Sequence, residues 1–165
     1  MKSGLNEVFL RKICEMELNK TKEKLTTKCI EQQLKVVEQL QQEITEAQKQ
    51  ANDYGQPKDR YDAFRTKLMR QIELYAGQLD KANVVIDTLR KIPLNTKLDE
   101  VAFGAIVITN KQKLFISVGL GKVEFENNIY FAISPNVPVY NVLKGKKKGD
   151  KADFNGSTIV IESIY

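Results

Sequence analysis

Apolar residues recur at helical spacing through two long runs of the chain. In the run from Tyr61 to Ile92 they alternate steps of four and three, which keeps one apolar stripe facing a partner helix. An earlier run, Ile30 to Ala51, carries a second stripe with the same spacing. The pattern therefore predicts two helices that pair as an antiparallel coiled-coil hairpin. The predicted stripe residues are Leu68, Ile72, Tyr75, Leu79, Ala82, Ile86 and Leu89, opposite Ile30, Leu34, Val37, Gln41, Ile44, Gln48 and Ala51.

A short polar segment, residues 52–58, separates the two runs. Gly55 is suited to the left-handed conformation just past a helix end, and Pro57 is suited to the first turn of the next helix. We expect the first helix to run from about Leu18 to about Asp53, with the tip of the hairpin at residues 52–62. At about 1.5 Å per residue, arms of about thirty residues would hold this tip about 45 Å from the base.

The composition changes at Pro93, which ends the second helical run. Six of the nine glycines follow it, and no arginine does. Short extended runs separated by turn residues predict a mostly antiparallel sheet, and residues 137–143 fit one or two helical turns. The fold class is therefore α+β. Its predicted parts are an N-terminal extension at 1–15, the hairpin at 16–92 and a small domain at 97–165. The expected strands are 101–109, 113–118, 122–126, 129–133, 152–154 and 158–164.

The chain has no histidine, which excludes Ser-His-Asp and Cys-His catalysis and most zinc sites. Cys14 and Cys29 match no metal motif and are expected to be small apolar side chains in a reducing compartment. No apolar run reaches the length that a bilayer requires. We therefore expect a cytoplasmic, non-enzymatic protein with no membrane contact. The glycines of Val118-Gly119-Leu120-Gly121-Lys122 predict a turn between strands, because no helix follows to make a phosphate site.

Carboxylates gather at the predicted tip, where Asp53, Asp59 and Asp62 lie within ten residues of one another. The last two are three residues apart and are expected on one face of the second helix. Two or three such groups could help to hold Mg²⁺, which takes one or two protein carboxylates and completes its shell with water and phosphate oxygens. Acidic residues at a helix start are also favoured by free N–H groups and the helix dipole, so a purely structural role stays open.

The net charge is +5, and the densest positive run is Lys144-Gly145-Lys146-Lys147-Lys148-Gly149-Asp150. Acidic residues are interspersed with basic ones elsewhere, which is not the pattern of a protein that wraps duplex DNA. The run fits a solvated turn. It also fits a contact with an acidic protein surface or a nucleic-acid backbone.

The second half resembles the Gre-type bacterial transcript cleavage factors, which have an N-terminal coiled-coil hairpin and an FKBP-like C-terminal domain. The stretch Val101-Ala102-Phe103-Gly104-Ala105-Ile106-Val107 is similar to the strand that opens that domain. Ile133-Ser134-Pro135-Asn136-Val137-Pro138, then Leu143, Gly145-Lys146 and Gly149-Asp150, follow the family pattern I-S-x-x-S-P … L-x-G-K-x-x-x-D, except that Val137 stands where the family has serine.

The resemblance implies that RNA polymerase is the partner, with the hairpin entering its secondary channel. The family's gripping loop maps onto Ile133, Ser134 and Pro138, and Lys146 and Lys147 are also expected to bind the polymerase. In the family, tip acids bring a second Mg²⁺ to the polymerase, which then cleaves backtracked RNA. By this resemblance the chain binds no cofactor tightly, shares a transient Mg²⁺ with the polymerase and contacts nascent RNA indirectly.

The tip departs from the family, whose sequence there is approximately G-D-L-S-E-N-A-E-Y. If its tyrosine is aligned with Tyr61, the two key acids fall on Tyr54 and Pro57. The acids of this chain stand at other positions, so metal delivery does not carry over residue by residue. Stimulated cleavage and modulation of elongation by channel occupancy both remain open.

Two other classes of function fit parts of the sequence. The long apolar stripe could pair between chains as well as within one, which would suit a coiled-coil adaptor without effect on polymerase. The short Gly-Pro turn favours pairing within one chain and hence a monomer. An FKBP-like fold also raises peptidyl-prolyl isomerase activity, although the chain has no tryptophan to line such a pocket.

Overall fold

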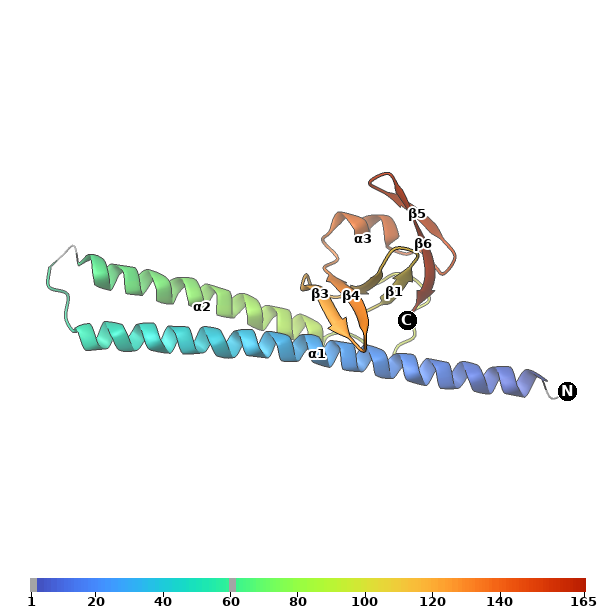
Figure 1. Ribbon diagram of the computed structural model, residues 1–165, viewed down its shortest axis with the longest axis horizontal. Helices are drawn as coiled ribbons and strands as arrows, with labels where there is room; N and C mark the ends of the chain where they lie inside the picture. Colours follow the sequence, from blue (N-terminus) through green and yellow to red (C-terminus); the bar gives the residue numbers. More distant parts are fainter. Residues whose placement is uncertain (1–2, 60–61) are drawn as a thin grey trace. The chain divides into compact units, whose positions relative to one another are not determined.

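The computed structural model describes the backbone of residues 3–59 and 62–165, and the side chains of the same residues except 3–15 and 18. Two long helices come first, a six-stranded sheet follows, and one short helix lies between strands (Figure 1). The predicted α+β class is thus confirmed. The elements are α1 (Ser3–Tyr54), α2 (Ala63–Arg90), β1 (Ile106–Thr109), β2 (Lys113–Ile116), β3 (Gly121–Phe125), β4 (Asn128–Ile133), α3 (Pro138–Leu143), β5 (Lys151–Phe154) and β6 (Ser157–Ile164).

The chain forms two compact units, and α1 contributes to both. One unit, here called the hairpin unit, is Ile30–Asp87. The other, here called the sheet unit, combines Met1–Cys29 with Thr88–Tyr165. The predicted boundaries at residues 15 and 97 remain predictions, since they follow a different criterion from this division by contacts.

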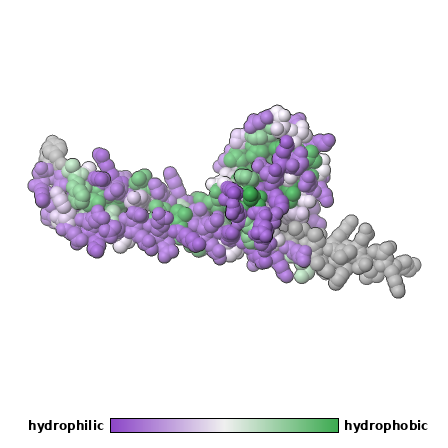
Figure 2. Space-filling view, in the orientation of Figure 1, coloured by the Kyte–Doolittle hydropathy of each residue, from purple (hydrophilic) through white to green (hydrophobic). Residues whose placement is uncertain are grey.

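Within the hairpin unit, α1 and α2 run side by side in opposite directions (Figure 1). The predicted stripe of α2 is the one that packs, since Leu68, Ala82 and Ile86 are buried. The predicted stripe of α1 is partly wrong, because Leu40 and Ala47 are buried whereas Gln41 and Gln48 are exposed. This register places apolar side chains in the seam and leaves both glutamines in water. Figure 2 shows hydrophilic side chains over most of the visible outer surface of the two helices.

The helix ends also differ from the sequence-based expectation. The first helix begins at Ser3, well before Leu18, so residues 3–15 continue α1 instead of forming a separate element. The second helix begins at Ala63, so Pro57 does not lie in its first turn as predicted. The predicted αL residue is confirmed, since Gly55 has φ 83° directly after the end of α1. Tyr61, the predicted start of the second helical run, lies outside the described residues.

The strands form one sheet in the order β3-β4-β2-β1-β6-β5. All neighbours are antiparallel except β2 and β4, which are parallel. The expected strands all occur, although β1 is shorter than its predicted run from Val101. The turn at Gly119 and Gly121 joins β2 to β3, as the sequence predicts.

One face of the sheet carries the main hydrophobic core of the domain. The short helix α3 contributes Tyr140 and Leu143 to this core, and Val101 and Ala105 join it from the segment before β1. Side chains alternate between faces along a strand, so every second residue of the central strands points into this cluster. Those strand residues are Val107, Leu114, Ile116, Ala152, Ile159 and Ile161.

The opposite face of the sheet is also apolar and buried. It carries the residues that alternate with the main core, including Ile106, Phe115, Tyr130 and Ala132. In the same unit, α1 also has a buried surface. Lys22, Leu25, Thr26 and Cys29 follow helical spacing along one side of α1 and are all buried. At the edge of this contact Lys24 forms an ion pair with Glu126, with Nζ and Oε1 3.3 Å apart.

A lysine lies in the middle of this buried surface. The side chain of Lys22 is only 1% exposed. Its amine has no hydrogen-bond partner among the described residues. Burial lowers the pKa of the Lys22 amine, because an apolar environment disfavours the charged form. Such an unpaired buried group opposes folding, so the apolar neighbours of Lys22 must more than offset its cost.

We predict that Lys22→Met stabilises the protein. Methionine keeps the length of the side chain and removes the buried amine, so the free energy of unfolding should rise by about 1–3 kcal/mol near neutral pH. Between the lowered folded-state pKa and the usual lysine value of 10.5, the unfolded chain binds more protons than the folded chain. Wild-type stability therefore gains with rising pH in that window, and the advantage of the variant should shrink as the pH approaches 10.5.

Denaturant unfolding of both proteins across this pH range measures the difference directly. Cys29, whose pKa burial raises to about 11, has an opposite pH effect, but both proteins share it and it cancels. Lys20→Met, at an exposed position of the same helix, is the matched control and should change little. A Lys22→Met protein that is no more stable than wild type would show that the amine finds a partner in solution.

Gly104 lets the backbone before β1 pack closely against the residues that follow α2. Gly104 has φ +85°, and a Cβ atom there would lie 3.0 Å from Pro93 Cδ and 3.2 Å from Ile92 Cγ2. Gly104 also donates its N–H to the carbonyl of Ile116 at 2.7 Å. The position thus excludes a side chain for two reasons, backbone conformation and space.

We predict that Gly104→Ala lowers the free energy of unfolding by about 2–4 kcal/mol, from left-handed strain together with crowding. Gly156→Ala is the matched control, because Gly156 has φ +74° but no atom within 4 Å of an added Cβ. Strain alone should cost that variant about 1 kcal/mol. Equal losses in the two variants, measured by denaturant unfolding, would rule out the crowding.

Candidate functional site

The turn of the hairpin is held by Asp62, which precedes α2. Its carboxylate accepts hydrogen bonds from the backbone N–H of Lys58 at 3.2 Å and of Arg65 at 3.1 Å. The second bond satisfies one of the free N–H groups of the helix start, which makes Asp62 the N-cap of α2. These bonds hold the pKa of Asp62 below its usual value, with the Arg65 bond the largest cause. The helix begins at Ala63 because this cap is placed there.

Aromatic and basic side chains complete the turn. The rings of Tyr54 and Phe64 lie 4.9 Å apart between centroids, and Lys58 Nζ lies 5.3 Å from the centre of the Tyr54 ring. The Tyr54 hydroxyl hydrogen-bonds Asp62, and the pKa of Tyr54 is raised, first by desolvation and then by this bond. The Arg65 guanidinium donates to the carbonyl of Gly55. The turn is therefore tied across from the end of α1 to the start of α2.

Sequence reasoning did not find the Tyr54 and Phe64 pair. The alignment with the family placed Tyr54 only as a missing acid. Two aromatic residues that flank a Gly-Pro segment are a usable signal, because a tight turn brings such residues together across the gap. The pair gives the tip an apolar centre beneath its charges, and Phe64 remains 47% exposed.

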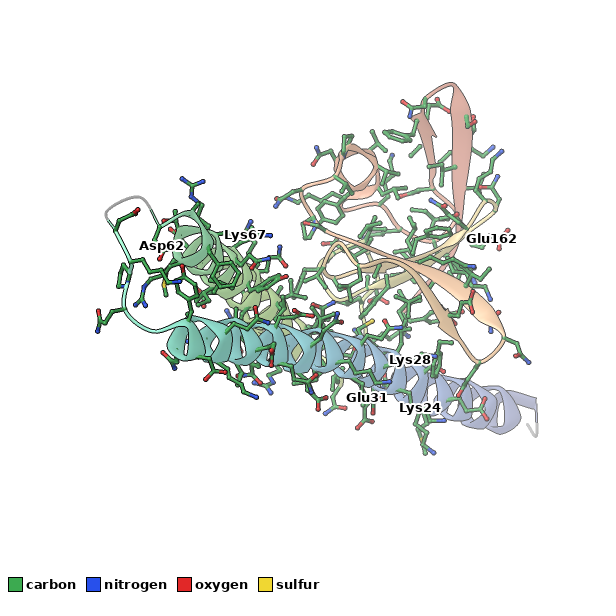
Figure 3. All side chains as sticks on the ribbon, turned by 60° about the vertical axis from the view of Figure 1, so that its left-hand side comes forward. Lys24, Lys28, Glu31, Asp62, Lys67 and Glu162 are labelled. Carbon is green, nitrogen blue, oxygen red and sulfur yellow. The ribbon has the colours of Figure 1, made fainter. Side chains whose placement is uncertain are left out.

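The three tip aspartates differ in their surroundings. Asp53 is exposed on the last turn of α1, and Asp59 is exposed in the connecting segment. Only Asp62 borders α2, so the expectation that Asp59 and Asp62 share a face of that helix is wrong. Figure 3 labels Asp62 at the start of α2.

The predicted Mg²⁺ role of the tip aspartates stays a prediction. Across the described residues, no three acidic, histidine or cysteine side chains gather in a way that could hold a metal ion. The Asp62 carboxylate is committed to backbone N–H groups and Tyr54, so its oxygens are poor candidates for a metal ligand. Asp59, Asp62 and Glu73 line one shallow depression of about 320 Å³, together with Arg65 and Arg70. The arginines offset part of the carboxylate charge, so the depression has a mixed charge.

The second set of predicted site residues divides between the two ends of α3. Ile133, Ser134 and Pro138 lie at its start, where Ser134 Oγ accepts the N–H of Asn136 at 3.2 Å and Pro138 is the first helical residue. Ile133 packs against the main core, whereas Pro138 is exposed. Lys146 and Lys147 follow the other end, beyond six helical residues that span about 9 Å. The structure thus separates the lysines from the Ile133 to Pro138 segment.

Of the two cysteines, the structure describes the side chain of Cys29. Cys29 is a free, buried thiol whose pKa burial raises to about 11, which makes it a poor nucleophile. Cys14 lies among the residues whose side chains are not described. Within the part of the chain that the structure describes, no helix combines the length and the apolar character needed to cross a membrane.

The comparisons with known proteins give a structural likeness. No protein-family model matches the sequence, and no curated protein matches it. Among solved structures, the chain is similar to the GreA factor homolog 1 (Gfh1) protein of Thermus thermophilus. The match covers 82% of this chain and 94% of that one, with 16% identity and a TM-score of 0.30. A TM-score and an identity this low establish neither a shared fold nor a shared function.

We predict that Asp62 is the tip aspartate that matters for stability. Asp62→Ala should lower the thermal midpoint of unfolding, because it removes the N-cap of α2 and the bond to Tyr54. Since its folded-state pKa lies below the ordinary value of 3.8, the contribution is fully present above that pH and is lost as the pH falls through the folded-state pKa.

Circular dichroism melts at neutral and acidic pH test this assignment. Asp53→Ala and Asp59→Ala are the matched controls, since both residues are exposed. The difference between wild type and Asp62→Ala should shrink below about pH 4. A loss of stability as large in Asp53→Ala would mean that the cap does not stabilise the turn.

Proposed function

We propose that this chain is a Gre-like accessory factor that binds bacterial RNA polymerase near the secondary channel and places the hairpin tip inside it. The proposal rests first on the sequence resemblance of the C-terminal domain, above all the Ile133 to Pro138 segment. The factor has no catalytic residues of its own in this proposal and acts on the polymerase active site as a monomer, with indirect contact to nascent RNA.

The observation that carries the proposal is the construction of the tip. Two antiparallel helices end in a turn whose described residues Asp62, Tyr54 and Arg65 make hydrogen bonds between the end of α1 and the start of α2. A probe that enters a channel has to keep its shape without support from its own globular part. The described contacts around Gly55 provide that shape locally.

The contacts at the tip support modulation of elongation by occupancy of the polymerase channel better than delivery of Mg²⁺ to the polymerase active site. Asp62 is engaged in the turn, whereas Asp53 and Asp59 are exposed. Among the described residues, no three acidic, histidine or cysteine side chains gather in a way that could hold a metal ion. Any ion that Asp53 and Asp59 meet would have to be held mainly by the polymerase and the RNA. Stimulated cleavage therefore depends on Asp53 and Asp59 alone in this proposal.

The contact with polymerase is proposed to lie at the start of α3. Pro138 is exposed there, and Ser134 shapes the preceding turn through its bond to Asn136. Proline is rigid and loses little conformational entropy on binding, which suits an anchor residue. Lys146 and Lys147 lie past the other end of α3, so the proposed contact at its start does not include them.

We predict that Pro138→Glu weakens binding to core RNA polymerase by about tenfold or more, the effect typical of a residue at the centre of an interface. Asn141→Glu, at an exposed position of the same short helix, is the matched control and should bind as wild type does. A pull-down with bacterial core polymerase measures both. A double variant with Asp53→Asn and Asp59→Asn should bind core polymerase as strongly as wild type does.

A cleavage assay on a backtracked complex then separates the two modes of action. If wild type stimulates cleavage and the double asparagine variant does not, the two exposed acids serve the reaction. If wild type binds and slows elongation without cleavage, the tip acts by occupancy. A wild-type protein that does not bind polymerase would overturn the proposal and favour a coiled-coil adaptor.

A further inference from the structure

The segment after α3, residues 144–151, is here called the lysine loop, and it includes the densest run of positive residues in the sequence. It carries five lysines in eight residues, and all are exposed except Lys146, which is half-buried. They are Lys144, Lys146, Lys147, Lys148 and Lys151. Such density of one charge is expected to attract a polyanion.

The backbone of the lysine loop is fixed by hydrogen bonds to other parts of the sheet unit. Val101 donates to the carbonyl of Lys146 at 2.8 Å and accepts from Gly145 at 2.9 Å. Gly149 donates to the carbonyl of Ile161 at 2.7 Å. Gly145 and Gly149 have φ of 73° and 90°, conformations that lysine would rarely adopt. The lysines are therefore presented by a shaped loop.

The nearby carboxylates Asp150, Asp153 and Glu100, the last of which lies opposite Lys147 in an isolated β-bridge, offset only part of the charge of these amines. Asp150 accepts the backbone N–H of Lys147 at 2.7 Å, and Asp153 accepts the hydroxyl of Thr158 at 2.7 Å. Among the described side chains, none of the five lysine amines takes part in an ion pair. The dipole of α3 favours a cation at its end, but it accounts only for Lys144. The side-chain amines of the other four lysines thus have no assigned intramolecular partner in the described part of the chain.

The composition of the loop distinguishes between two kinds of anionic partner. Protein interfaces are depleted in lysine and depend on apolar or aromatic anchors at their centre. The apolar residues that flank this loop, Leu143 and Ala152, are buried in the main core and cannot serve as anchors. Phosphate groups, in contrast, are bound by lysine as a point charge and need no apolar anchor.

We infer that the lysine loop binds the phosphate backbone of nucleic acid, without sequence preference, and does not bind an acidic protein surface. This assignment is independent of the polymerase proposal, because it concerns the free protein and a surface beyond the opposite end of α3 from Pro138. In the setting of that proposal, the loop would provide a second contact, with DNA or RNA.

The test is fluorescence anisotropy of the full chain with two labelled probes of equal phosphate number, a short DNA duplex and a single-stranded RNA. Four to five phosphate contacts should make the affinity fall about 100-fold between about 50 and 200 mM salt. The variant with Lys144, Lys146, Lys147 and Lys148 changed to Gln should bind at least about tenfold more weakly at low salt, and its salt slope should be smaller by about 3.

The matched control changes four exposed lysines of the two long helices, Lys20, Lys35, Lys49 and Lys81, to Gln. It has the same net charge as the loop variant, so it should retain the wild-type affinity if the loop is the site. Equal losses in the two variants would overturn the inference. So would absence of wild-type binding at low salt, or competition by polyglutamate as effective as that by the DNA probe.

Comparison of the two probes identifies the source of the phosphate, and preference for either supports the inference. Circular dichroism melts check that each variant is folded. The polymerase pull-down of the loop variant keeps the two proposals apart. Retained polymerase binding with lost nucleic-acid binding supports the loop assignment, whereas failure of wild type in the pull-down removes only the polymerase proposal.

Discussion

The sheet has two apolar faces, and the segment after the long helices supplies only one six-residue helix to cover them. Helix α3 covers one face through Tyr140 and Leu143. The other face, with Phe115 and Tyr130, belongs to the same compact unit as the part of α1 before Ile30. An exposed apolar face of this size would be unfavourable in water, so a part of the chain far away in sequence is needed to bury it. Within that unit, α1 contributes the buried residues Lys22, Leu25, Thr26 and Cys29.

The same requirement shows which parts of the fold the sequence could predict. The α2 stripe, the strands and Gly55 follow from local periodicity and backbone preference, and each was found. The helical N-terminal part of α1 was not predicted, because the buried face of α1 belongs to different compact units along the helix. Lys22 and Thr26 interrupt the apolar pattern on that face, so a search for a single heptad frame gives no signal there.

The α1 stripe and the start of α2 show a second kind of failure. Leu34 and Leu40 both satisfy a heptad step, and only packing against α2 selects Leu40 and exposes the glutamines. Pro57 is a valid first-turn residue, but the Asp62 cap with its bonds to Lys58 and Arg65 outweighs that preference. Charge at the tip was visible in the sequence. The sequence did not show that Asp62 alone of the three aspartates caps α2, because this role depends on hydrogen bonds between residues on both sides of the turn.

Because α1 is one uninterrupted helix from Ser3 to Tyr54, no single cut separates the two compact units cleanly. A fragment that starts after Cys29 would lose the cover of one sheet face while keeping every strand. Removal of the C-terminal domain would instead leave Leu25 and its neighbours in water. Domain dissection of this protein would therefore best retain the first thirty residues with the sheet, joined in trans or by a new linker.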